Sequence, residues 1–500
     1  MSDLRNHPLV ASVREIALAR HIPLLLVGGA VRDWLLGKEA HDLDFAVQGN
    51  AKTLARAVAD ELGGAFYLMD AERNTARVFI TRRGQPAFNL DFAVCRGASW
   101  EEDLFGRDFS INAIALDVQS GAMLDSAGGL ADLTRRVVRQ VTPHAVTDDP
   151  VRALRAVRIA LALEYTLDPA TAQAAREAAG SLDRPSPERV RDELLKALAL
   201  PNAARAVRWF DELGLLQAMI PEVAPLRDCT QSPPHRYAVL EHTFVVLDYL
   251  DGLIADLRGQ NTASLAITST ARAALLDQLD SLTTSERSRA AVFRLAVLLH
   301  DIAKPLKRSV GADGRIHFAG HEAAGAKMAA ARATALRLSS TEVDQIRTTV
   351  QHHAEPNRIA RDGGPALGSP APGSLAPRDI HRFMCAAGDC APEIALFCPA
   401  DGYGKAGAES SPQDMQRRSD VAARVIEQYY ACYSPAVAPR PLVSGDDVMA
   451  LGVRQGPLIG RILNAVREAQ MIGEITTRAQ ALALVQQLNA QAELPSSSED

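Results

Sequence analysis

The sequence predicts an α+β protein in which an α/β head precedes a mostly helical body. Residues 20–165 alternate short apolar runs, typical of strands, with helical stretches. From about Asp149 onward, apolar residues recur at helical spacing almost without a break. The 500 residues are too many for one hydrophobic core, so we expect about three domains.

The composition is that of an ordinary globular protein, with 47% hydrophobic residues, 23% charged residues and a net charge of −6. Fibrous, collagen-like and wholly disordered classes are therefore excluded. No apolar run approaches the ~18 residues of a membrane span, and the first residues lack the apolar core of a signal peptide. The six cysteines form no CxxC pair. We expect a cytoplasmic protein with no membrane association, and the mild acidity still allows a local basic groove.

The elements of the head can be predicted in order along the chain. HIPLLLVGG predicts a buried strand that enters a glycine turn, and VRDWLLGKEA predicts a short helix. DLDFAV predicts a strand, and AKTLARAVADELGG predicts a helix that ends in glycine. VFITRRG and AFNLDFAV predict neighbouring strands joined by a glycine-containing turn.

The body is predicted to be helical in two blocks. The first contains VRALRAVRIALALEY, ERVRDELLKALAL and NAARAVRWFDELGLLQAMI, and a proline-containing loop at 225–234 separates it from a second block that starts near His235. Residues 255–290 predict an inserted helix with polar flanks. The Gly/Pro/Ser-rich stretch 361–377 predicts a flexible exposed loop, and the polar tail 491–500 is expected to be disordered.

One segment of the head combines a glycine turn with paired carboxylates. Gly28 and Gly29 follow a predicted strand and precede a helix, a place where backbone N–H groups can receive a phosphate and where Arg32 can add a cation. Asp42 and Asp44 are two positions apart on a strand, so both point to one face. Two such carboxylates repel each other unless a cation such as Mg²⁺ lies between them. Taken singly, a glycine pair is usually a turn and an Asp-x-Asp a solvated strand edge, but their combination is more specific.

This segment resembles a known family. GGAVRDWLLG followed by DLD is similar to the nucleotidyltransferase signature of bacterial CCA-adding enzymes and poly(A) polymerases. Further blocks of that family follow in its order: RDFSINAIA at 107–115, LDSAGGLADL at 124–133, DDPVRALRAVR at 148–158, ERVRDE at 188–193 and a C-terminal stretch at 442–463. Gly106 replaces an arginine that usually begins the second block. The resemblance covers most of the chain and implies a polymerase-β-like head.

The resemblance also implies roles for individual residues. Asp42 and Asp44 would hold Mg²⁺, and Asp91 would be a third acid beside the metal or the partner of a nearby arginine. The nucleotide and its phosphates would be bound by Gly28, Gly29, Arg32, Arg107, Arg155 and Arg158. Asp149 and Arg152 would read the base of the incoming nucleotide.

The spacing of the last four charged residues supports a shared surface independently. Asp149, Arg152, Arg155 and Arg158 follow one another at intervals of three, which makes a drifting stripe on one helix face. The alternative interpretation of this stripe is a solvated ladder of salt bridges. Asp149 can also be read as the cap of the helix that begins at Pro150.

A second set of residues in the body consists of ordered histidines and aspartates. The set contains His242, His300, Asp301, His321, His353 and Asp401. It resembles the ligand set of HD-domain metal-dependent phosphohydrolases. By that resemblance His242, His300, Asp301 and Asp401 would form a primary site. His321 and His353 would serve a second metal or the phosphate, and Lys304 would meet a phosphate oxygen.

Imidazoles and carboxylates suit divalent transition metals, so the HD site is expected to take Ni²⁺, Mn²⁺, Co²⁺, Fe²⁺ or Zn²⁺. The alternative is an HD fold that has lost its activity and is kept for RNA binding or packing. We therefore expect a nucleotidyltransferase head at 20–145, a helical nucleotide- and tRNA-binding segment at 146–230, and an HD domain at 235–410. A helical RNA-contacting tail at 411–490 would follow.

The resemblance implies transfer of CMP and AMP from CTP and ATP to the 3′ end of tRNA, completing its CCA end, together with phosphohydrolase activity. The same blocks occur in poly(A) polymerases and in enzymes that add only CC or only A, so these alternatives stay open. A phosphohydrolase with a vestigial nucleotidyltransferase half would not need Asp42 and Asp44. A regulatory protein uridylyltransferase would need further C-terminal domains, and about 100 residues follow Asp401. A pure RNA-binding protein would need neither carboxylate set. No obligate protein partner is expected.

Overall fold

The structure of the chain is a computed structural model that describes residues 4–40, 42–81, 87–259, 265–284, 287–362, 377–434 and 439–493. Most of the loop predicted at 361–377 and of the tail predicted at 491–500 lies outside the described residues. The chain divides into two compact units. The first comprises Met1–Ala197 and Trp209–Met219, and the second comprises Leu198–Arg208 and Ile220–Asp500.

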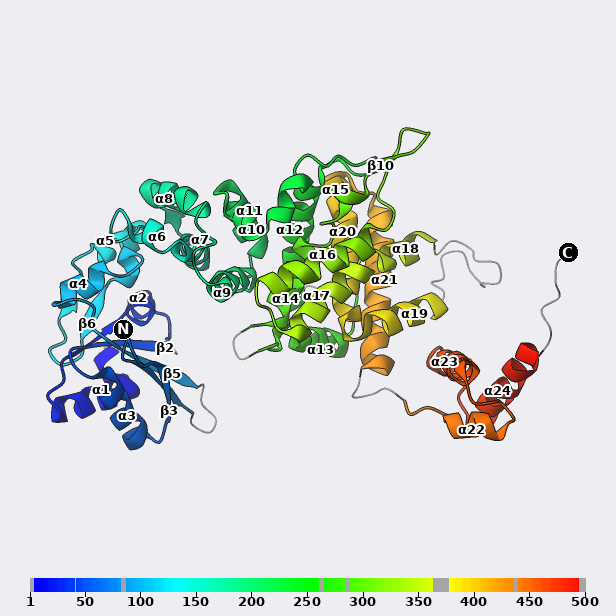
Figure 1. Ribbon diagram of the computed structural model, residues 1–500, viewed down its shortest axis with the longest axis horizontal. Coiled ribbons are helices and arrows are strands. Elements are labelled where there is room, and N and C mark those ends of the chain that lie inside the picture. Colours follow the sequence, from blue (N-terminus) through cyan, green and yellow to red (C-terminus); the bar gives the residue numbers. More distant parts are fainter. Residues whose placement is uncertain are drawn as a thin grey trace. The chain divides into compact units, whose positions relative to one another are not determined.

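The first unit begins with a seven-stranded sheet, which lies in the blue part of Figure 1. Its strands, in spatial order, are β3 (Ala65–Asp70), β4 (Thr75–Ile80), β5 (Phe88–Val94), β2 (Asp42–Val47), β1 (Leu24–Val27), β6 (Ala115–Asp117) and β7 (Met123–Leu124). Strands β2 and β5 run parallel, with Asp44 opposite Asp91, and every other neighbouring pair is antiparallel. The parallel pair therefore brings acidic residues from two distant parts of the chain onto neighbouring strands.

Short helices surround this sheet. They are α1 (Pro8–Ala19), α2 (Gly29–Leu35), α3 (Ala51–Leu62), α4 (Trp100–Phe105) and α5 (Gly129–Arg135). Helix α3 packs against β4 and β5, and α1 packs against α3. Helix α3 ends as its sequence predicts, because Gly63 takes the left-handed conformation at φ 67°. Strand β3 was not predicted, since AFYLMD is largely exposed and lacks a clear alternation of apolar and polar residues.

The rest of the first unit is helical apart from two short strands. It contains α6 (Ala145–Asp148), α7 (Val151–Leu163), α8 (Pro169–Ala179), α9 (Pro187–Leu198), α11 (Leu215–Met219) and the strands β8 (Val137–Val138) and β9 (Thr166–Leu167). Helix α10 (Ala203–Glu212) is divided between the units, since Leu198–Arg208 belongs to the second. The long helix predicted from NAARAVRWFDELGLLQAMI is divided into α10 and α11, since Gly214 between them has φ +74°. Helix α7 packs against α6 and α8 and presents its charged face to the head, as described below.

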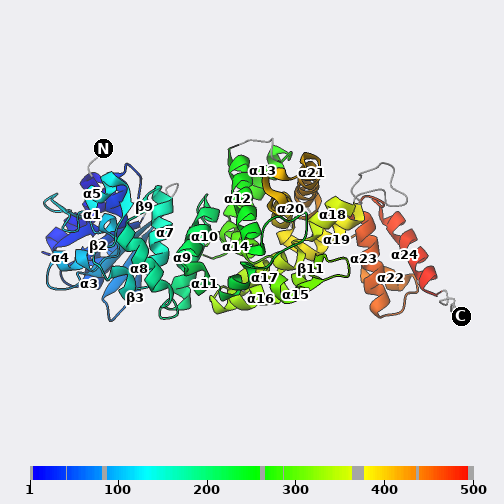
Figure 2. The ribbon, with the colours of Figure 1, turned by 90° about the horizontal axis from the view of Figure 1, so that it is seen from above.

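The second unit is predominantly a bundle of helices (Figure 2). It contains α12 (Val239–Arg258), α13 (Ser269–Asp280), α14 (Arg289–Leu298), α15 (Lys304–Lys307), α16 (His321–Ala335), α17 (Ser340–His352), α18 (Glu355–Asp362), α19 (Pro377–Ala387), α20 (Ala391–Ala406) and α21 (Pro412–Gln428). A small hairpin of β10 (Ser309–Val310) and β11 (Ile316–His317) follows α15. Helices α14 and α20 are almost wholly buried, and α20 packs against α12 and α21.

Three further helices end the described chain: α22 (Gly445–Ala450), α23 (Pro457–Met471) and α24 (Arg478–Glu493). They enclose a separate core that includes Val448, Ile462, Val466 and Val485. Together with the sheet-based head, this helical body confirms the predicted α+β fold class. Among the described residues, one stretch, Pro377–Glu409, has the length and apolar composition of a membrane span, but 78% of its most apolar window is buried inside the protein. A buried core helix gives the same signal.

Candidate functional site

Strand β2 carries the paired carboxylates of the head. Asp42 is exposed and Asp44 is partly buried, and both lie on the same face because they are two positions apart. The Asp42 Oδ1 atom accepts a hydrogen bond of 2.8 Å from Asn89 Nδ2 on β5. This bond fixes one carboxylate and leaves the pair facing an open pocket.

The neighbouring strand adds a third acid. Asp91 stands opposite Asp44, and both of its oxygens accept hydrogen bonds from Arg77, at 2.7 Å from Nε and 2.8 Å from Nη2. Burial, together with the negative charges of Asp91 and Asp42, raises the pKa of Asp44 to about 6, although Arg107 opposes the shift. The site thus has an excess of negative charge that a divalent cation would neutralise, and carboxylate oxygens suit Mg²⁺.

The glycine turn comes very close to this carboxylate pair. Gly28 has φ +78°, and a Cβ atom at this position would lie 3.1 Å from Asp44 Oδ2 and 3.5 Å from Arg107 Nη1. A larger residue would therefore be strained in its backbone and crowded against Asp44. Arg32, one turn later, is fixed by Asn112 Oδ1 at 2.7 Å and by Asp33 Oδ1 at 2.8 Å.

A pocket of about 480 Å³ gathers most of the residues predicted for nucleotide binding. Its lining includes Gly28, Gly29, Arg32, Asp42, Asp44, Arg107, Arg155 and Arg158. Gly28 lies in the turn after β1, Gly29 and Arg32 lie on α2, Asp42 and Asp44 on β2, and Arg155 and Arg158 on α7. Asp91, Asp149 and Arg152 are not part of this lining. Four arginines therefore share one pocket with Asp42 and Asp44, and Asp33, Glu39 and Asp108 also line it. Arginines beside paired carboxylates suit a metal-bound polyphosphate.

Two acids that the sequence did not single out hold the arginines of α7. Glu193 on α9 accepts from Arg155 Nε at 2.8 Å and from Arg158 Nε at 2.7 Å. Asp108 accepts from Arg155 Nη1 at 3.1 Å. Burial would raise the pKa of Glu193, yet Arg158 and Arg155 hold it below the usual range. The motif ERVRDE was the available signal for Glu193, but the motif alone names no partner for it.

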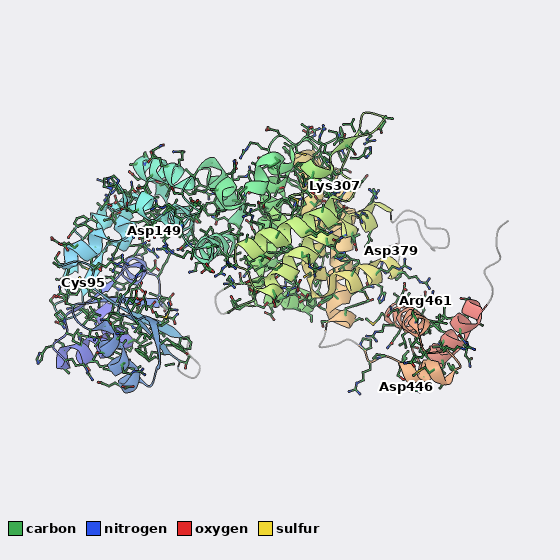
Figure 3. All side chains as sticks on the ribbon, viewed as in Figure 1. Cys95, Asp149, Lys307, Asp379, Asp446 and Arg461 are labelled. Carbon is green, nitrogen blue, oxygen red and sulfur yellow. The ribbon has the colours of Figure 1, made fainter. Side chains whose placement is uncertain are left out.

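Asp149, which is labelled in Figure 3, and Arg152 have partners outside the lining of this pocket. Asp149 Oδ2 accepts from Arg189 Nη2 at 2.6 Å and lies 3.7 Å from Arg152 Nε. The Nη atoms of Arg152 donate to backbone carbonyls of Gly106, Arg107 and Ala145 at 3.0–3.2 Å. Arg152 thereby ties α7 to the loop that carries Arg107.

The second unit brings the six predicted HD ligands together in two groups of three. His242, His300 and Asp401 form one group, and Asp301, His321 and His353 form the other. Within each group, one ligand atom from each residue lies within 4.8 Å of the others. Asp301 also connects the groups, because its Oδ2 lies 3.0 Å from His300 Nε2 and 3.6 Å from His242 Nε2.

The backbone fixes the tautomers of three of these histidines. Nδ1 of His300, His321 and His353 donates to the carbonyl oxygen three residues earlier, at 2.7–2.8 Å. In the neutral ring Nε2 is then left as the lone-pair nitrogen that a metal needs. The Nε2 atoms of His242 and His300 are buried without a hydrogen-bond partner among the described residues. Such unsatisfied nitrogens beside aspartates fit a divalent metal better than they fit a packed core.

Cations surround the open side of this cluster. A second pocket of about 480 Å³ is lined by Asp301, His321, His353 and Asp401, and also by Lys304, Lys405, Arg358 and His235. Lys304 Nζ lies 2.6 Å from both Asp301 Oδ2 and Gln231 Oε1. Burial and the nearby Lys304 lower the pKa of His235 to about 3, so that ring is neutral. Positive charge beside a metal site is what an anionic phosphoester requires.

Comparison with known proteins matches three parts of this chain to family profiles. Family profiles match "Poly A polymerase head domain" at residues 24–139, "Probable RNA and SrmB- binding site of polymerase A" at 164–226 and "HD domain" at 239–383. An A-adding tRNA nucleotidyltransferase of Deinococcus radiodurans is 34% identical over 468 residues, which cover 92% of this chain and 94% of the relative. The chain belongs to the family of CCA-adding enzymes and poly(A) polymerases.

Other members of this family are similar over nearly the whole chain. A CC-adding tRNA nucleotidyltransferase of Thermus thermophilus is 30% identical over 466 residues, which cover 92% of this chain and 92% of the relative. The solved structure of a CCA-adding enzyme with CTP has a TM-score of 0.63 at 18% identity, covering 98% of this chain and 97% of that one. The predicted family, fold and HD domain are thus confirmed. The relatives named for A addition and for CC addition have similar sequence identities to this chain, 34% and 30%.

Proposed function

We propose that the head transfers CMP or AMP from CTP or ATP to the 3′ end of a tRNA without a nucleic-acid template. The observation that carries this proposal is the shared pocket of Asp42 and Asp44 with four arginines. Family membership supports it, since the relatives described above are named for this reaction. The carboxylates and the arginines have distinct roles in it.

Asp42 and Asp44 would hold Mg²⁺ through oxygens on their common face. The excess negative charge around Asp44 supports this assignment, because its pKa is raised to about 6 by burial and by Asp91 and Asp42. Bound Mg²⁺ would supply activation of the attacking hydroxyl and stabilisation of the leaving pyrophosphate. Asp91, whose oxygens are both bonded to Arg77, would act on the charge of the site more than as a ligand.

The arginines would hold the triphosphate. Arg32 and Arg107 approach from the glycine turn and the loop before η2 (Ser110–Asn112), and Arg155 and Arg158 approach from α7. Each of the last two is anchored by its Nε atom on Glu193, and Arg155 is also held through Nη1 by Asp108. A planar fork fixed at one edge can bind phosphate oxygens without losing much side-chain entropy.

Asp149 and Arg152 would select the base. Aspartate offers only acceptors and arginine only donors, which matches the amine and ring nitrogen that cytosine and adenine share. Uracil and guanine place a carbonyl oxygen where the amine would be. In this structure Arg152 donates to backbone carbonyls, and Asp149 accepts a hydrogen bond from Arg189. For Arg152 to read the base, its side chain would have to rotate so that its N–H groups donate to the nucleotide.

One assay tests this proposal and separates its variants. The protein is incubated with a tRNA lacking CCA, a tRNA ending in CC and an unrelated RNA, each with labelled CTP or ATP, and the products are sequenced. Complete CCA addition, CC addition alone, A addition alone and unselective poly(A) addition give four different product sets. Absence of any addition to all three RNAs would contradict the proposal.

A second activity is favoured by the two ligand groups of the HD domain. We propose that this domain is a metal-dependent phosphohydrolase that holds a divalent transition metal through His242, His300, Asp401 and Asp301. A metal bound there would supply a nucleophilic hydroxide and polarise the phosphoester. Lys304 and Lys405 would hold the phosphate oxygens, since both line the same pocket.

The phosphohydrolase proposal is tested with an RNA that ends in a 2′,3′-cyclic phosphate or a 3′-phosphate. Removing either group prepares a hydroxyl for nucleotide addition. Replacing both His300→Ala and Asp301→Ala should abolish hydrolysis and leave CMP incorporation by the head largely intact. If protein loaded with Ni²⁺, Mn²⁺, Co²⁺ or Fe²⁺ hydrolyses neither end, the HD domain has a structural role.

We also propose a division of the chain into four functional parts. We assign residues 20–145 to nucleotidyl transfer, 146–230 to nucleotide and tRNA binding, 235–410 to the HD domain and 411–490 to contact with RNA. The three profile matches at 24–139, 164–226 and 239–383 support the first three assignments. A cytoplasmic location agrees with relatives named as tRNA nucleotidyltransferases, because tRNA is their substrate by name.

A further inference from the structure

Asp401 differs from the other HD ligands in how its carboxylate is held. Its Oδ1 faces the metal group, 3.2 Å from His242 Nε2. Its Oδ2 accepts a hydrogen bond of 2.7 Å from Asn357 Nδ2 and lies 3.3 Å from Lys405 Nζ. One oxygen is therefore available to a metal, and the other is bound by side chains that belong to no ligand group.

Asn357 is itself held from behind. Its Oδ1 accepts a hydrogen bond from Arg418 Nη1 on α21 and another from the Cys398 thiol at 3.4 Å. Arg418 in turn donates from Nε and Nη2 to Asp414 Oδ2 at 3.1 and 3.0 Å. A chain of polar groups thus runs from the half-exposed Asp414 through the buried Arg418 and Asn357 to the buried Asp401.

The chemistry of this chain allows only one orientation of the Asn357 amide. An ionised carboxylate can only accept, so the amide must present its NH₂ group to Asp401. Arginine can only donate, so the amide must present its oxygen to Arg418. The two neighbours together fix which amide atom points where, and thereby which oxygen of Asp401 is bound.

The glycines beside Asp401 leave the room that this arrangement needs. A Cβ atom at Gly402 would overlap the Cδ atom of Arg418, and one at Gly404 would overlap Val246 and crowd His242. Helix α20 can therefore approach both α21 and α12 closely only because these two positions lack side chains. Asn357, Asp401 and Arg418 are each at most 8% exposed, which makes an unpaired group here costly.

We propose that Asn357, oriented by Arg418, is a positioning residue that fixes Asp401 with Oδ1 turned toward the metal held by His242 and His300. This inference rests on the proposed metal site of the HD domain. Asn357 and Arg418 do not belong to the set of predicted HD ligands. Replacing a residue that hydrogen-bonds to a metal ligand commonly changes metal affinity by about 10- to 100-fold.

The test is the affinity of the full-length protein for Co²⁺, measured by competition titration and by its visible absorption. The signal lost in His300→Ala isolates the HD site from other bound ions. Asn357→Leu removes both polar contacts at similar volume, and we expect it to weaken Co²⁺ binding about 10- to 100-fold. Arg418→Met keeps the stem that passes Gly402 and removes the donors, so a smaller loss is expected.

The chain offers a matched control in the same unit. Gln345 is a buried amide on α17 that donates to the Glu393 carboxylate at 3.2 Å, and Glu393 belongs to neither ligand group. Gln345→Leu should lower the melting temperature but leave the Co²⁺ affinity and spectrum unchanged. A purely structural role for Asn357 would make the two leucine variants alike in both measurements.

Each outcome decides the matter. Weak binding in Asn357→Leu and Arg418→Met with normal binding in Gln345→Leu supports the proposal. Co²⁺ binding within twofold of wild type in Asn357→Leu would overturn the positioning role of Asn357 but not the metal site. Equal weakening of Co²⁺ binding in Gln345→Leu would have the same consequence. If wild type shows no Co²⁺ signal that His300→Ala removes, the metal site itself fails and this inference fails with it. Should Asn357→Leu not fold, Asn357→Ser and Arg418→Met decide by the same criteria.

Discussion

The most informative single change in the head is Glu193→Gln. Glu193 is 4% exposed and uses each of its two oxygens for one arginine of the nucleotide pocket. A glutamine has only one acceptor oxygen and presents an NH₂ group on the other side. It can therefore hold Arg155 or Arg158, but not both. The other arginine would face the NH₂ group of the glutamine. Because both groups are donors, its guanidinium would leave its present orientation.

The size of the effect follows from the lost contact. A hydrogen bond to a charged group contributes about 1.5–3 kcal/mol, and about 1.4 kcal/mol corresponds to a tenfold change. We expect kcat/KM for CTP and ATP to fall about 10- to 100-fold, mainly through a higher KM, because the arginines bind the triphosphate. Steady-state kinetics with a tRNA acceptor and varied nucleotide measure both constants.

Asp132→Asn provides the matched control. Asp132 is likewise buried in the first unit and accepts from Ser110 Oγ at 2.6 Å and from Arg139 Nε at 2.8 Å, but it does not line the pocket. Both variants should lower the melting temperature, and only Glu193→Gln should raise KM. A KM within twofold of wild type in Glu193→Gln would refute the claim that this carboxylate orients the arginines.

Three further predictions concern the paired carboxylates of the head, base selection by Asp149 and the pH dependence of stability at Glu342 in the HD domain. Asp42→Ala and Asp44→Ala should each reduce nucleotide addition more than about 100-fold, or about 3 kcal/mol of barrier, and activity above a tenth of wild type in both would contradict their assignment. Asp149→Asn should relax the kcat/KM ratio of CTP over UTP about 10- to 100-fold, since a mispaired hydrogen bond costs about 1–3 kcal/mol. The side chain of Asp149 caps no helix in the structure, so an unchanged ratio with a lower melting temperature would leave it as a structural partner of Arg189. Glu342 is buried, and hydrogen bonds led by that of Arg287 overcome burial and lower its pKa from 4.5 to about 2. Because the folded pKa is the lower one, this stabilisation of about 3 kcal/mol is present above pH 4.5 and is lost as the pH falls toward 2. The melting temperature of Glu342→Gln should depend less on pH than that of wild type below about pH 5, and equal slopes would contradict this.

The sequence was sufficient to place the carboxylates of the head. The alternation of side chains along a strand predicts a common face for Asp42 and Asp44, and β2 has the predicted bounds. The strand that brings Asp91 beside Asp44 was also predicted, but its parallel pairing with β2 was not, because pairing across 47 positions depends on the tertiary fold.

The partners of the arginines could not be predicted from spacing. Arg152 and Asp149 are one helical turn apart, which predicts a joint edge, yet Arg152 donates to carbonyls of Gly106 and Arg107 about 45 positions away. Backbone carbonyls carry no residue type and leave no signal in a sequence. Glu193 and Asn357 were missed for a related reason, since their roles depend on which side chains the fold places beside them.

The two sites differ in how their negative charge is balanced. In the head, burial, Asp91 and Asp42 raise the pKa of Asp44 to about 6, and Arg107 compensates only in part. In the HD domain, burial opposes the charge of Asp301, yet His300 and Lys304 hold its pKa well below the usual range. Neighbouring groups thus favour the charged form of Asp301 before anything binds, whereas burial and nearby carboxylates disfavour the charged form of Asp44, which an added cation would favour. Because nucleoside triphosphates carry Mg²⁺ with them, this difference makes the charge of the head site dependent on substrate, while the HD site is preorganised by its own residues.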